Sequence, residues 1–227
     1  ATLLLPWSEA AAESAASVVG AGVPPAVILP PPVPAAPPPA PDAPDVVAYG
    51  ANPDKRGIDL LYEAWREVRP EGGRLGISGL ERSEARRLLR KTGVQEPPGV
   101  EWMGAMSRER WAATVAGARL FVNAARFEDW GVAQMEALSA GTPLVTVPSG
   151  GGNVAFGLAR TLAPELVAPE RTVEALAAAM RAGLALGGAA RTTYAERAER
   201  LLVPYREDAL RRLVADDVLP RLLDSPS

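Results

Sequence analysis

Short apolar runs alternate with amphipathic stretches over the middle of the chain. The runs predict five strands, at residues 46–50, 74–79, 100–104, 119–123 and 143–147. Apolar residues at helical spacing between them predict four helices, at residues 58–68, 83–93, 108–118 and 131–141. This alternation is typical of an α/β protein with a Rossmann-like, doubly wound parallel sheet and right-handed crossovers. Ligands of such sheets bind beyond the carboxyl ends of the strands, so the loops that follow the five runs form the candidate site.

The two ends of the chain differ from this regular middle. Residues 1–29 indicate a strand at 2–5, a helix capped by Ser8 and a strand at 26–29, a unit too small to bury its own faces. Prolines crowd residues 30–44, and because proline lacks an N–H group we expect a semi-rigid, extended linker and a domain boundary there. Helical spacing predominates after residue 153. It predicts helices at 172–186, 193–202 and 206–223, with a short strand at 166–169.

Composition narrows the function. The chain has 227 residues, 48% of them hydrophobic and 22% charged, as in soluble globular proteins. Its net charge of −3 provides no global basic field, so we expect no nucleic-acid partner, and any anion site must be local. The absence of cysteine excludes disulfides and thiol catalysis within this chain and fits a reducing cytoplasm. The absence of histidine likewise excludes a Ser-His-Asp triad and a histidine-ligated zinc.

Two glutamates dominate the stretch between the fourth and fifth predicted strands. Glu128 falls in a polar loop, and Glu136 falls about one and a half turns into a helix that begins near Gly131. The N-terminus of that helix offers unpaired N–H groups and a favourable dipole to a phosphate. Carboxylates accept hydrogen bonds from sugar hydroxyls, so carboxylates beside a phosphate seat favour a nucleotide sugar as ligand. The alternative is a pair of solvated surface carboxylates.

The sequence around these glutamates resembles the retaining enzymes of glycosyltransferase family 4, the group 1 type, in the C-terminal, donor-binding half of their GT-B fold. The matching residues are EDWGVAQMEALSAGTPLV at 128–145, with the glutamate spacing, the internal glycine and the trailing GTPLV all in agreement. The resemblance implies that Glu128 contacts the donor sugar hydroxyls and Glu136 the ribose hydroxyls. It also implies that the backbone amides around Trp130, Gly131 and Val132 meet the diphosphate. The residues alone leave two equal alternatives for Trp130: it anchors the loop, or it forms a wall of the ligand site.

A second match covers AYGANPDKRGIDLLYEAW at 48–65. A strand ends at Gly50, and Arg56 takes the position of the family's phosphate-binding lysine, with Lys55 beside it. The arginine that commonly follows the strand glycine in the family is replaced by Ala51. One of two expected diphosphate charges is therefore missing, and the bidentate fork of Arg56 would compensate in part.

Two further segments have weaker family counterparts. VEWMG at 100–104 matches a strand whose end contacts the nucleobase, which makes the backbone near Trp102 and Met103 the predicted base platform, with core packing as the alternative. SGGGN at 149–153 resembles the family's glycine pair but lacks the glutamate that usually follows, and a flexible turn explains it as well as a phosphate cradle does.

The combined reading is the donor-binding part of a retaining glycosyltransferase that uses a nucleotide diphosphate sugar, with Glu128 and Arg56 as its catalytic residues. No Asp-x-Asp motif is present, so we expect neither a metal nor another cofactor. Residues 1–29 resemble only the tail of the family's N-terminal domain, which would supply a glycan or lipid-linked acceptor. We expect a cytoplasmic protein; the basic stretch 82–91 is most simply a solvated helix face, with peripheral contact at the inner face of a membrane as the alternative. A non-catalytic module that binds nucleotide sugars is the competing hypothesis, motivated by Ala51 and the missing acceptor half.

Overall fold

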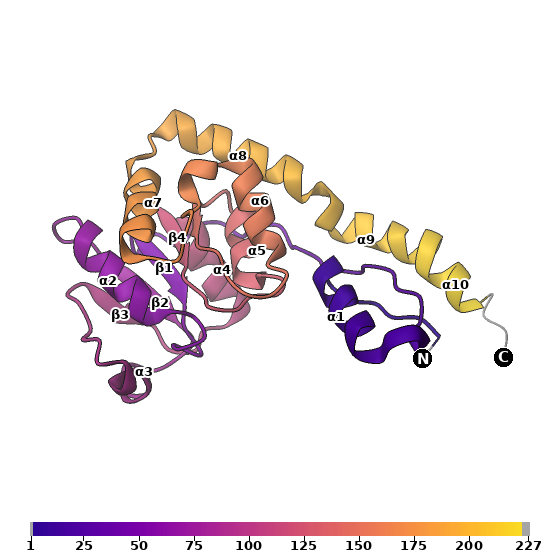
Figure 1. Ribbon diagram of the computed structural model, residues 1–227. Coiled ribbons are helices and arrows are strands. Elements are labelled where there is room, and N and C mark those ends of the chain that lie inside the picture. The colour runs from indigo at the N-terminus through magenta and orange to yellow at the C-terminus, as the bar shows by residue number, and fades with distance from the viewer. Residues whose placement is uncertain (1, 224–227) are drawn as a thin grey trace.

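A five-stranded parallel sheet forms the centre of the computed structural model, which describes residues 2–223 (Figure 1). The strands are β1 Val46–Tyr49, β2 Leu75–Ser78, β3 Val100–Trp102, β4 Leu120–Asn123 and β5 Leu144–Thr146. Their order in the sheet is β3-β2-β1-β4-β5, and every pairing is parallel. The predicted Rossmann-like, doubly wound α/β fold is confirmed.

Helices cover both faces of the sheet. The helices of the chain are α1 Glu9–Val19, α2 Ile58–Val68, α3 Arg82–Leu89, α4 Arg108–Gly117, α5 Val132–Ser139, α6 Val154–Leu162, α7 Val173–Ala185, α8 Gly188–Leu202, α9 Glu207–Leu213 and α10 Leu219–Leu223. The chain first moves from β1 to β3 and then returns to β4 and β5, so right-handed crossovers place α4 and α5 on the face opposite α2 and α3. α7 packs against α2 on the first face, and α4 packs against α5 on the opposite face.

Apolar side chains from both layers meet in one continuous core. β2 and β4 are buried along their whole length, and β4 accordingly contains the apolar run Leu120, Phe121 and Val122. Trp65 and Tyr62 of α2 are fully buried, as is Phe121 of β4. This core fixes the five strand ends relative to one another, and with them the loops of the candidate site.

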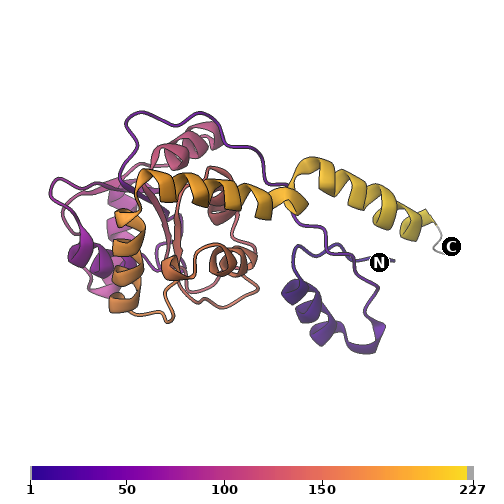
Figure 2. The ribbon, with the colours of Figure 1, turned by 90° about the horizontal axis from the view of Figure 1, so that it is seen from above.

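The N-terminal unit lies apart from the sheet (Figures 1 and 2). Ser8 caps α1 as predicted, accepting a 3.1 Å hydrogen bond from the Ala11 amide. The predicted strands at 2–5 and 26–29 are wrong, because they form only an isolated parallel bridge between Leu4 and Ala26. Prolines next to both segments remove backbone donors and keep the ladder from extending.

The proline-rich segment at 30–44 contains neither helix nor strand, and it lies against the sheet domain. Val33 is buried, and its amide donates to the Tyr205 carbonyl at 2.9 Å. Ser139 Oγ donates to the Pro34 carbonyl at 2.6 Å, and the Ala40 amide donates to the Ala113 carbonyl at 2.8 Å. The segment therefore runs as a strap over α4, α5 and the end of α8.

The C-terminal part is helical but less regular than predicted. The predicted helix at 206–223 is divided into α9 and α10 by a π-helical turn at Val214–Val218. The predicted strand at 166–169 is reduced to a single bridge between Thr146 and Val167, preceded by a 3₁₀ turn at Pro164–Leu166. No single helix among residues 2–223 is long and apolar enough to cross a membrane; α7 and the segment Gly188–Leu223 pass that test only as a pair bent by 107°.

Candidate functional site

A cavity of about 500 Å³ opens at the carboxyl edge of the sheet. It lies where the loops after β1, β2, β3 and β4 converge on α5. The lining residues are Tyr49, Arg56, Ser78, Gly79, Ala105, Met106, Arg108, Trp111, Glu128, Val132, Ala133 and Glu136. The structure thus brings both predicted glutamates and the predicted arginine into one cavity, at the edge where the alternating pattern places a ligand.

Arg56 and Glu128 are in direct contact at the wall of this cavity. Arg56 Nη1 donates to Glu128 Oε2 in an ion pair, and the two side chains are 20% and 13% exposed. The Arg56 guanidinium also lies 5.2 Å from the ring centroid of Tyr49, a cation–π arrangement. A cation and a carboxylate that partner each other can instead partner a phosphate and a hydroxyl when a ligand separates them.

Glu136 points into the cavity from the second turn of α5. Its side chain is only 12% exposed, and Trp111 Nε1 donates to its Oε2 at 3.0 Å. Burial raises the pKa of Glu136, although the hydrogen bond from Trp111 and the charge of Arg108 oppose that shift. Arg108 Nε lies 3.8 Å from Glu136 Oε1 and is largely exposed. Glu136 is therefore a partly desolvated acceptor with one oxygen held by an indole N–H.

The N-terminus of α5 borders the same cavity. Gly131 precedes the helix with a φ of 84°, and no side chain caps the first turn. The first amides of a helix have no partner within the helix, so those that begin at Val132 offer donors to an anion. A Cβ at Gly131 would lie 2.7 Å from Gln134 Nε2 and 2.8 Å from the Ala155 Cβ, which excludes a side chain at this turn.

Several predicted contact residues lie outside the cavity. Trp102 donates through Nε1 to the Tyr62 hydroxyl at 2.9 Å, and its ring packs against Gly50. Met103 packs against Gly76 of β2. The cavity is instead lined by Ala105 and Met106, two to four residues further along the chain, because β3 ends at Trp102 and the loop then turns inward.

Lys55 and Trp130 flank the cavity without lining it. The Lys55 ammonium lies 5.5 Å from the ring centroid of Phe127, on the outer side of the loop. Trp130 is 4% exposed, and its ring meets Tyr205 edge to face at 5.4 Å between centroids. Of the two explanations of this tryptophan, the structure therefore favours the loop anchor.

The glycine-rich loop at 149–153 is an ordered turn beneath Glu128. Gly150 forms a parallel bridge with Phe127, and the Asn153 amide donates to the Glu128 carbonyl at 3.1 Å. Asn153 adopts a φ of 30° and caps α6 through its side chain. None of its residues lines the cavity, so the loop supports Glu128 from behind.

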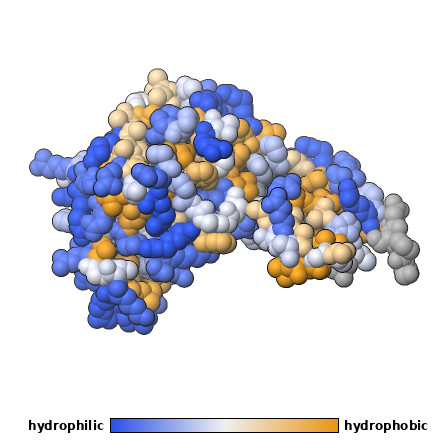
Figure 3. Space-filling view, viewed as in Figure 1, coloured by the Kyte–Doolittle hydropathy of each residue, from blue (hydrophilic) through white to orange (hydrophobic). Residues whose placement is uncertain are grey.

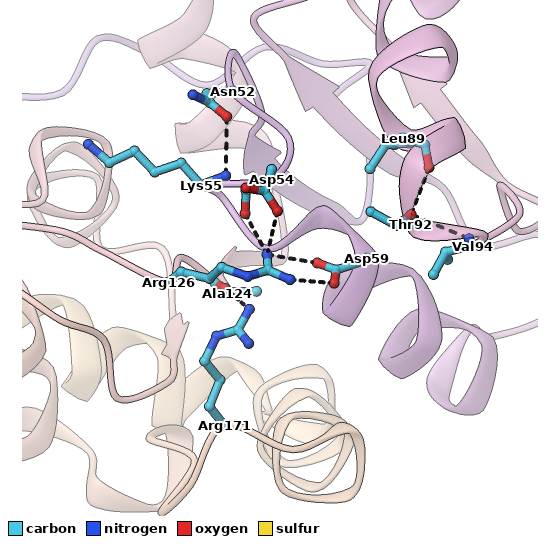
Figure 4. A network of polar contacts seen from close by, with 10 residues as sticks. All are labelled: Asn52, Asp54, Lys55, Asp59, Leu89, Thr92, Val94, Ala124, Arg126 and Arg171. Carbon is cyan, nitrogen blue, oxygen red and sulfur yellow. Dashed lines mark hydrogen bonds and ion pairs between the residues drawn. The ribbon is translucent and has the colours of Figure 1, made fainter.

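The sequence interpretation missed two groups of residues. Arg108 and Trp111 line the cavity from α4, which the interpretation treated only as a crossover helix. Arg126 links the loops around the cavity through ion pairs with Asp54 and Asp59 (Figure 4). An arginine two residues before the first glutamate, inside an otherwise apolar and acidic stretch, was the available signal. Among residues 2–223 no cluster of three acidic, histidine or cysteine side chains could hold a metal ion.

Comparison with known proteins identifies the family. The family model "Glycosyl transferases group 1" matches residues 43–185, more than half of the chain. Among curated proteins, glycogen synthase of Thermus thermophilus is 30% identical over 123 residues, which are 50% of this chain and 28% of the enzyme. The chain thus matches little more than a quarter of that relative.

Solved structures agree on the fold. Sucrose-phosphate synthase from Thermosynechococcus elongatus superimposes with a TM-score of 0.72 at 21% identity, covering 98% of this chain and 59% of that one. The pneumococcal O-GlcNAc transferase GtfA, solved with UDP and GlcNAc, gives a TM-score of 0.67 at 14% identity, covering 99% and 46%. With the parallel sheet, the paired glutamates and the family match over residues 43–185, the chain belongs to the group 1 glycosyltransferases, which have the GT-B fold.

Proposed function

We propose that this chain is the donor-binding part of a retaining glycosyltransferase and that its cavity binds a nucleotide diphosphate sugar. The observation that carries the proposal is the convergence of Arg56, Glu128 and Glu136 with an uncapped helix N-terminus in one cavity. An arginine and backbone amides suit a diphosphate, and two carboxylates suit two sets of sugar hydroxyls.

The geometry suggests a division of roles among these groups. Arg56 and the first amides of α5 would stabilise the diphosphate as it departs, the main electrostatic demand of the reaction. When the donor binds, Glu128 would turn from Arg56 to the donor sugar hydroxyls, and Glu136 would hold the ribose. The loop at Ala105 and Met106 would border the nucleobase. No step in this scheme requires a metal ion.

A second domain would supply the acceptor, a glycan or a lipid-linked molecule. Exposed large hydrophobic residues support this part of the proposal, because eight of the eleven found among residues 2–223 belong to the two terminal segments. They are Leu5, Trp7, Val18, Val19, Val203, Leu219, Leu222 and Leu223. Figure 3 shows a largely hydrophilic surface over the sheet domain and apolar surface gathered around α1.

Calorimetry with UDP and with GDP tests the donor site. We expect binding of at least one of them to the 227-residue chain, unchanged by a metal chelator. Arg56→Gln should weaken binding by about 1.5 to 3 kcal/mol, the scale of a lost charged hydrogen bond. The matched control is Lys55→Ala, which removes the neighbouring cation on the outer side of the same loop and should leave affinity nearly unchanged. A strict Mg²⁺ requirement, or equal losses in both variants, would contradict the proposed site.

A further inference from the structure

Three loops around the cavity meet at a single residue, Arg126, which does not line the cavity. They are the loop at 51–57, which carries Arg56, the loop at 124–131, which carries Glu128, and the glycine-rich loop at 149–153. Arg126 bonds to the first and third loops through its backbone. Its side chain bonds to Asp54 and to Asp59 of α2 (Figure 4).

The backbone of Arg126 bonds both neighbouring loops. Its amide donates to the Lys55 carbonyl at 2.8 Å, and its carbonyl accepts from the Gly150 amide at 2.9 Å. The Gly150 carbonyl in turn accepts from the Glu128 amide at 2.9 Å. The backbone positions on either side of Arg56 and Glu128 are therefore joined through one residue.

The side chain of Arg126 also joins the loop at 124–131 to the loop at 51–57 and to α2. Its guanidinium binds both carboxylate oxygens of Asp59 on α2, at 3.0 and 2.5 Å, and also donates to the Asp54 carbonyl. Burial tends to raise the pKa of Asp59, but the hydrogen bonds and charge of Arg126 outweigh it and hold that pKa below its ordinary value. A planar fork on a carboxylate restrains both side chains in orientation as well as distance.

Arg171 closes the junction on its far side. Its Nη2 donates to the Ala124 carbonyl at 3.2 Å, where β4 gives way to the loop of Glu128. Ala124 also lies against Gly57, where a Cβ would come within 1.9 Å of the Ala124 carbonyl oxygen and 2.6 Å of the Arg171 guanidinium. The two loops thus touch backbone to backbone at the point that Arg126 and Arg171 enclose.

We propose that Arg126 is a positioning residue of the donor site, which sets the spacing and orientation of Arg56 and Glu128 by joining the three loops into one unit. The proposal rests on the proposed function of the cavity. It assigns Arg126 no contact with the ligand. Its effect on binding therefore passes through Arg56 and Glu128, and its loss should loosen all three loops together.

The test compares Arg126→Gln and Asp59→Asn with a matched control, Arg74→Gln. Arg74 forms the same kind of fork, to Glu101 at 2.8 and 2.9 Å with a further bond to a backbone carbonyl, but at the start of β2, the opposite edge of the sheet. Each variant is examined by thermal unfolding, by hydrogen exchange of the amides in the three loops, and by calorimetry with UDP and GDP.

We expect both site variants to speed exchange of the Gly57, Glu128 and Gly150 amides, and to weaken nucleoside diphosphate binding about tenfold. Arg74→Gln should lower the melting temperature comparably and change neither readout. In an Arg56→Gln background, adding Arg126→Gln should weaken binding by less than about twofold, because the group that it positions is already gone.

Each outcome separates the two proposals. If the unaltered chain binds no nucleoside diphosphate, the proposed function fails, while the exchange comparison still decides whether Arg126 joins the loops. If Arg126→Gln does not fold, Asp59→Asn and Arg126→Lys carry the same comparison. Unchanged exchange and affinity in Asp59→Asn, with a loss of stability equal to that of Arg74→Gln, would overturn the positioning role.

Discussion

At the scale of single residues, the cavity holds three charged side chains, Arg56, Glu128 and Glu136, that are mostly shielded from water. Arg56 and Glu128 neutralise each other, so a ligand that needs either group must first separate them. Glu136 is held at 12% exposure, where a charged carboxylate loses most of its hydration. Both features are expected of groups whose best partner is a ligand, because functional sites retain charges that packing alone would remove.

The ion pair predicts an unusual gain of affinity. Glu128→Gln removes the carboxylate that competes with a phosphate for Arg56, so UDP or GDP should bind more tightly, by roughly fivefold or about 1 kcal/mol. Calorimetry on the 227-residue chain measures this. A weaker complex would mean that Glu128 helps to hold the diphosphate or its surroundings, and the competition would be refuted.

Burial of Glu136 predicts a pH-dependent gain of stability. Because its folded pKa is raised above the ordinary value of 4.5, the folded state holds the proton more strongly than the unfolded state does. That stabilisation is complete below pH 4.5 and is lost as pH rises through the folded pKa. Glu136→Gln keeps an acceptor for Trp111 and cannot ionise, so it should unfold at a higher temperature than the unaltered chain at pH 7, with a smaller difference at pH 4.

The same variant should weaken nucleoside diphosphate binding by about 1 to 3 kcal/mol if Glu136 holds the ribose. Calorimetry with UDP and GDP measures this change.

The control for the stability prediction is Glu101→Gln, because the hydrogen bond from Arg74 lowers the pKa of Glu101. The stabilisation from that carboxylate is complete above the ordinary pKa of 4.5 and is lost as pH falls through the lower folded pKa, so removing the charge should be destabilising at pH 7. Equal effects of the two variants across the pH range would refute the argument from burial.

At the scale of elements, the site depends on how strands hand over to helices. β1 and β4 lie side by side in the sheet, so their following loops emerge next to each other at the carboxyl edge. Gly57 and Gly131 each adopt a positive φ immediately before a helix, which lets the loops that carry Arg56 and Glu128 pass directly into α2 and α5. The cavity therefore occupies the space between two helix starts.

The contact between Gly57 and Ala124 predicts a large effect of one methyl group. Gly57→Ala places a Cβ 1.9 Å from the Ala124 carbonyl oxygen, so the loops must separate. The positive φ of 64° adds backbone strain, and we expect a total loss of about 3 kcal/mol or more of unfolding free energy. Gly93→Ala is the matched control, because Gly93 has a φ of 72° with nothing within 4 Å of its Cβ position and should lose only about 1 kcal/mol. Urea unfolding of both variants measures the difference, and equal losses would mean that the close approach relaxes freely.

At the scale of the whole molecule, a compact sheet domain carries two extensions on one side. The strap at 30–44 connects α1 to the sheet, and the helices after α7 run from the sheet towards α1 (Figures 1 and 2). The two are tied where Arg206 donates to the Val33 and Pro34 carbonyls at 3.0 and 2.9 Å. Both extensions would then lead to the acceptor domain that we propose.

This arrangement predicts binding without transfer. The 227-residue chain should bind the donor nucleotide and transfer almost no sugar, because aligning acceptor with donor in a closed cleft can supply roughly 7 to 11 kcal/mol of barrier reduction. The measurement is a transfer assay of this chain alone and of a longer chain that includes an acceptor domain, with one accepted donor. Activity only in the longer chain, abolished by Glu128→Ala, is the expected result. Full activity of the short chain would refute the division between donor and acceptor parts.

The sequence by itself determined the order and type of the central elements. The apolar runs that became β1 to β5 and the helices between them are local patterns. A strand that is buried on both faces needs a continuous apolar run, and a helix that is buried on one side needs apolar residues at helical spacing. The placement of Glu128 on a loop and Glu136 on a helix followed from the same patterns. Both were confirmed, and so was the family, which the glutamate spacing and the trailing GTPLV indicated.

Only the tertiary structure decided which side chains share the cavity. The turn after β3 brings Met106 inward and leaves Trp102 and Met103 outside, and the ion pair between Arg56 and Glu128 joins residues 72 positions apart. The strands predicted at 2–5 and 26–29 failed for a related reason, since a strand needs a ladder partner that no local pattern supplies. The contact of Arg126 with Asp59 depends on the packing of segments that are distant in the sequence. The sheet brings these segments together, and a local pattern in the sequence carries no information on which of their side chains will meet.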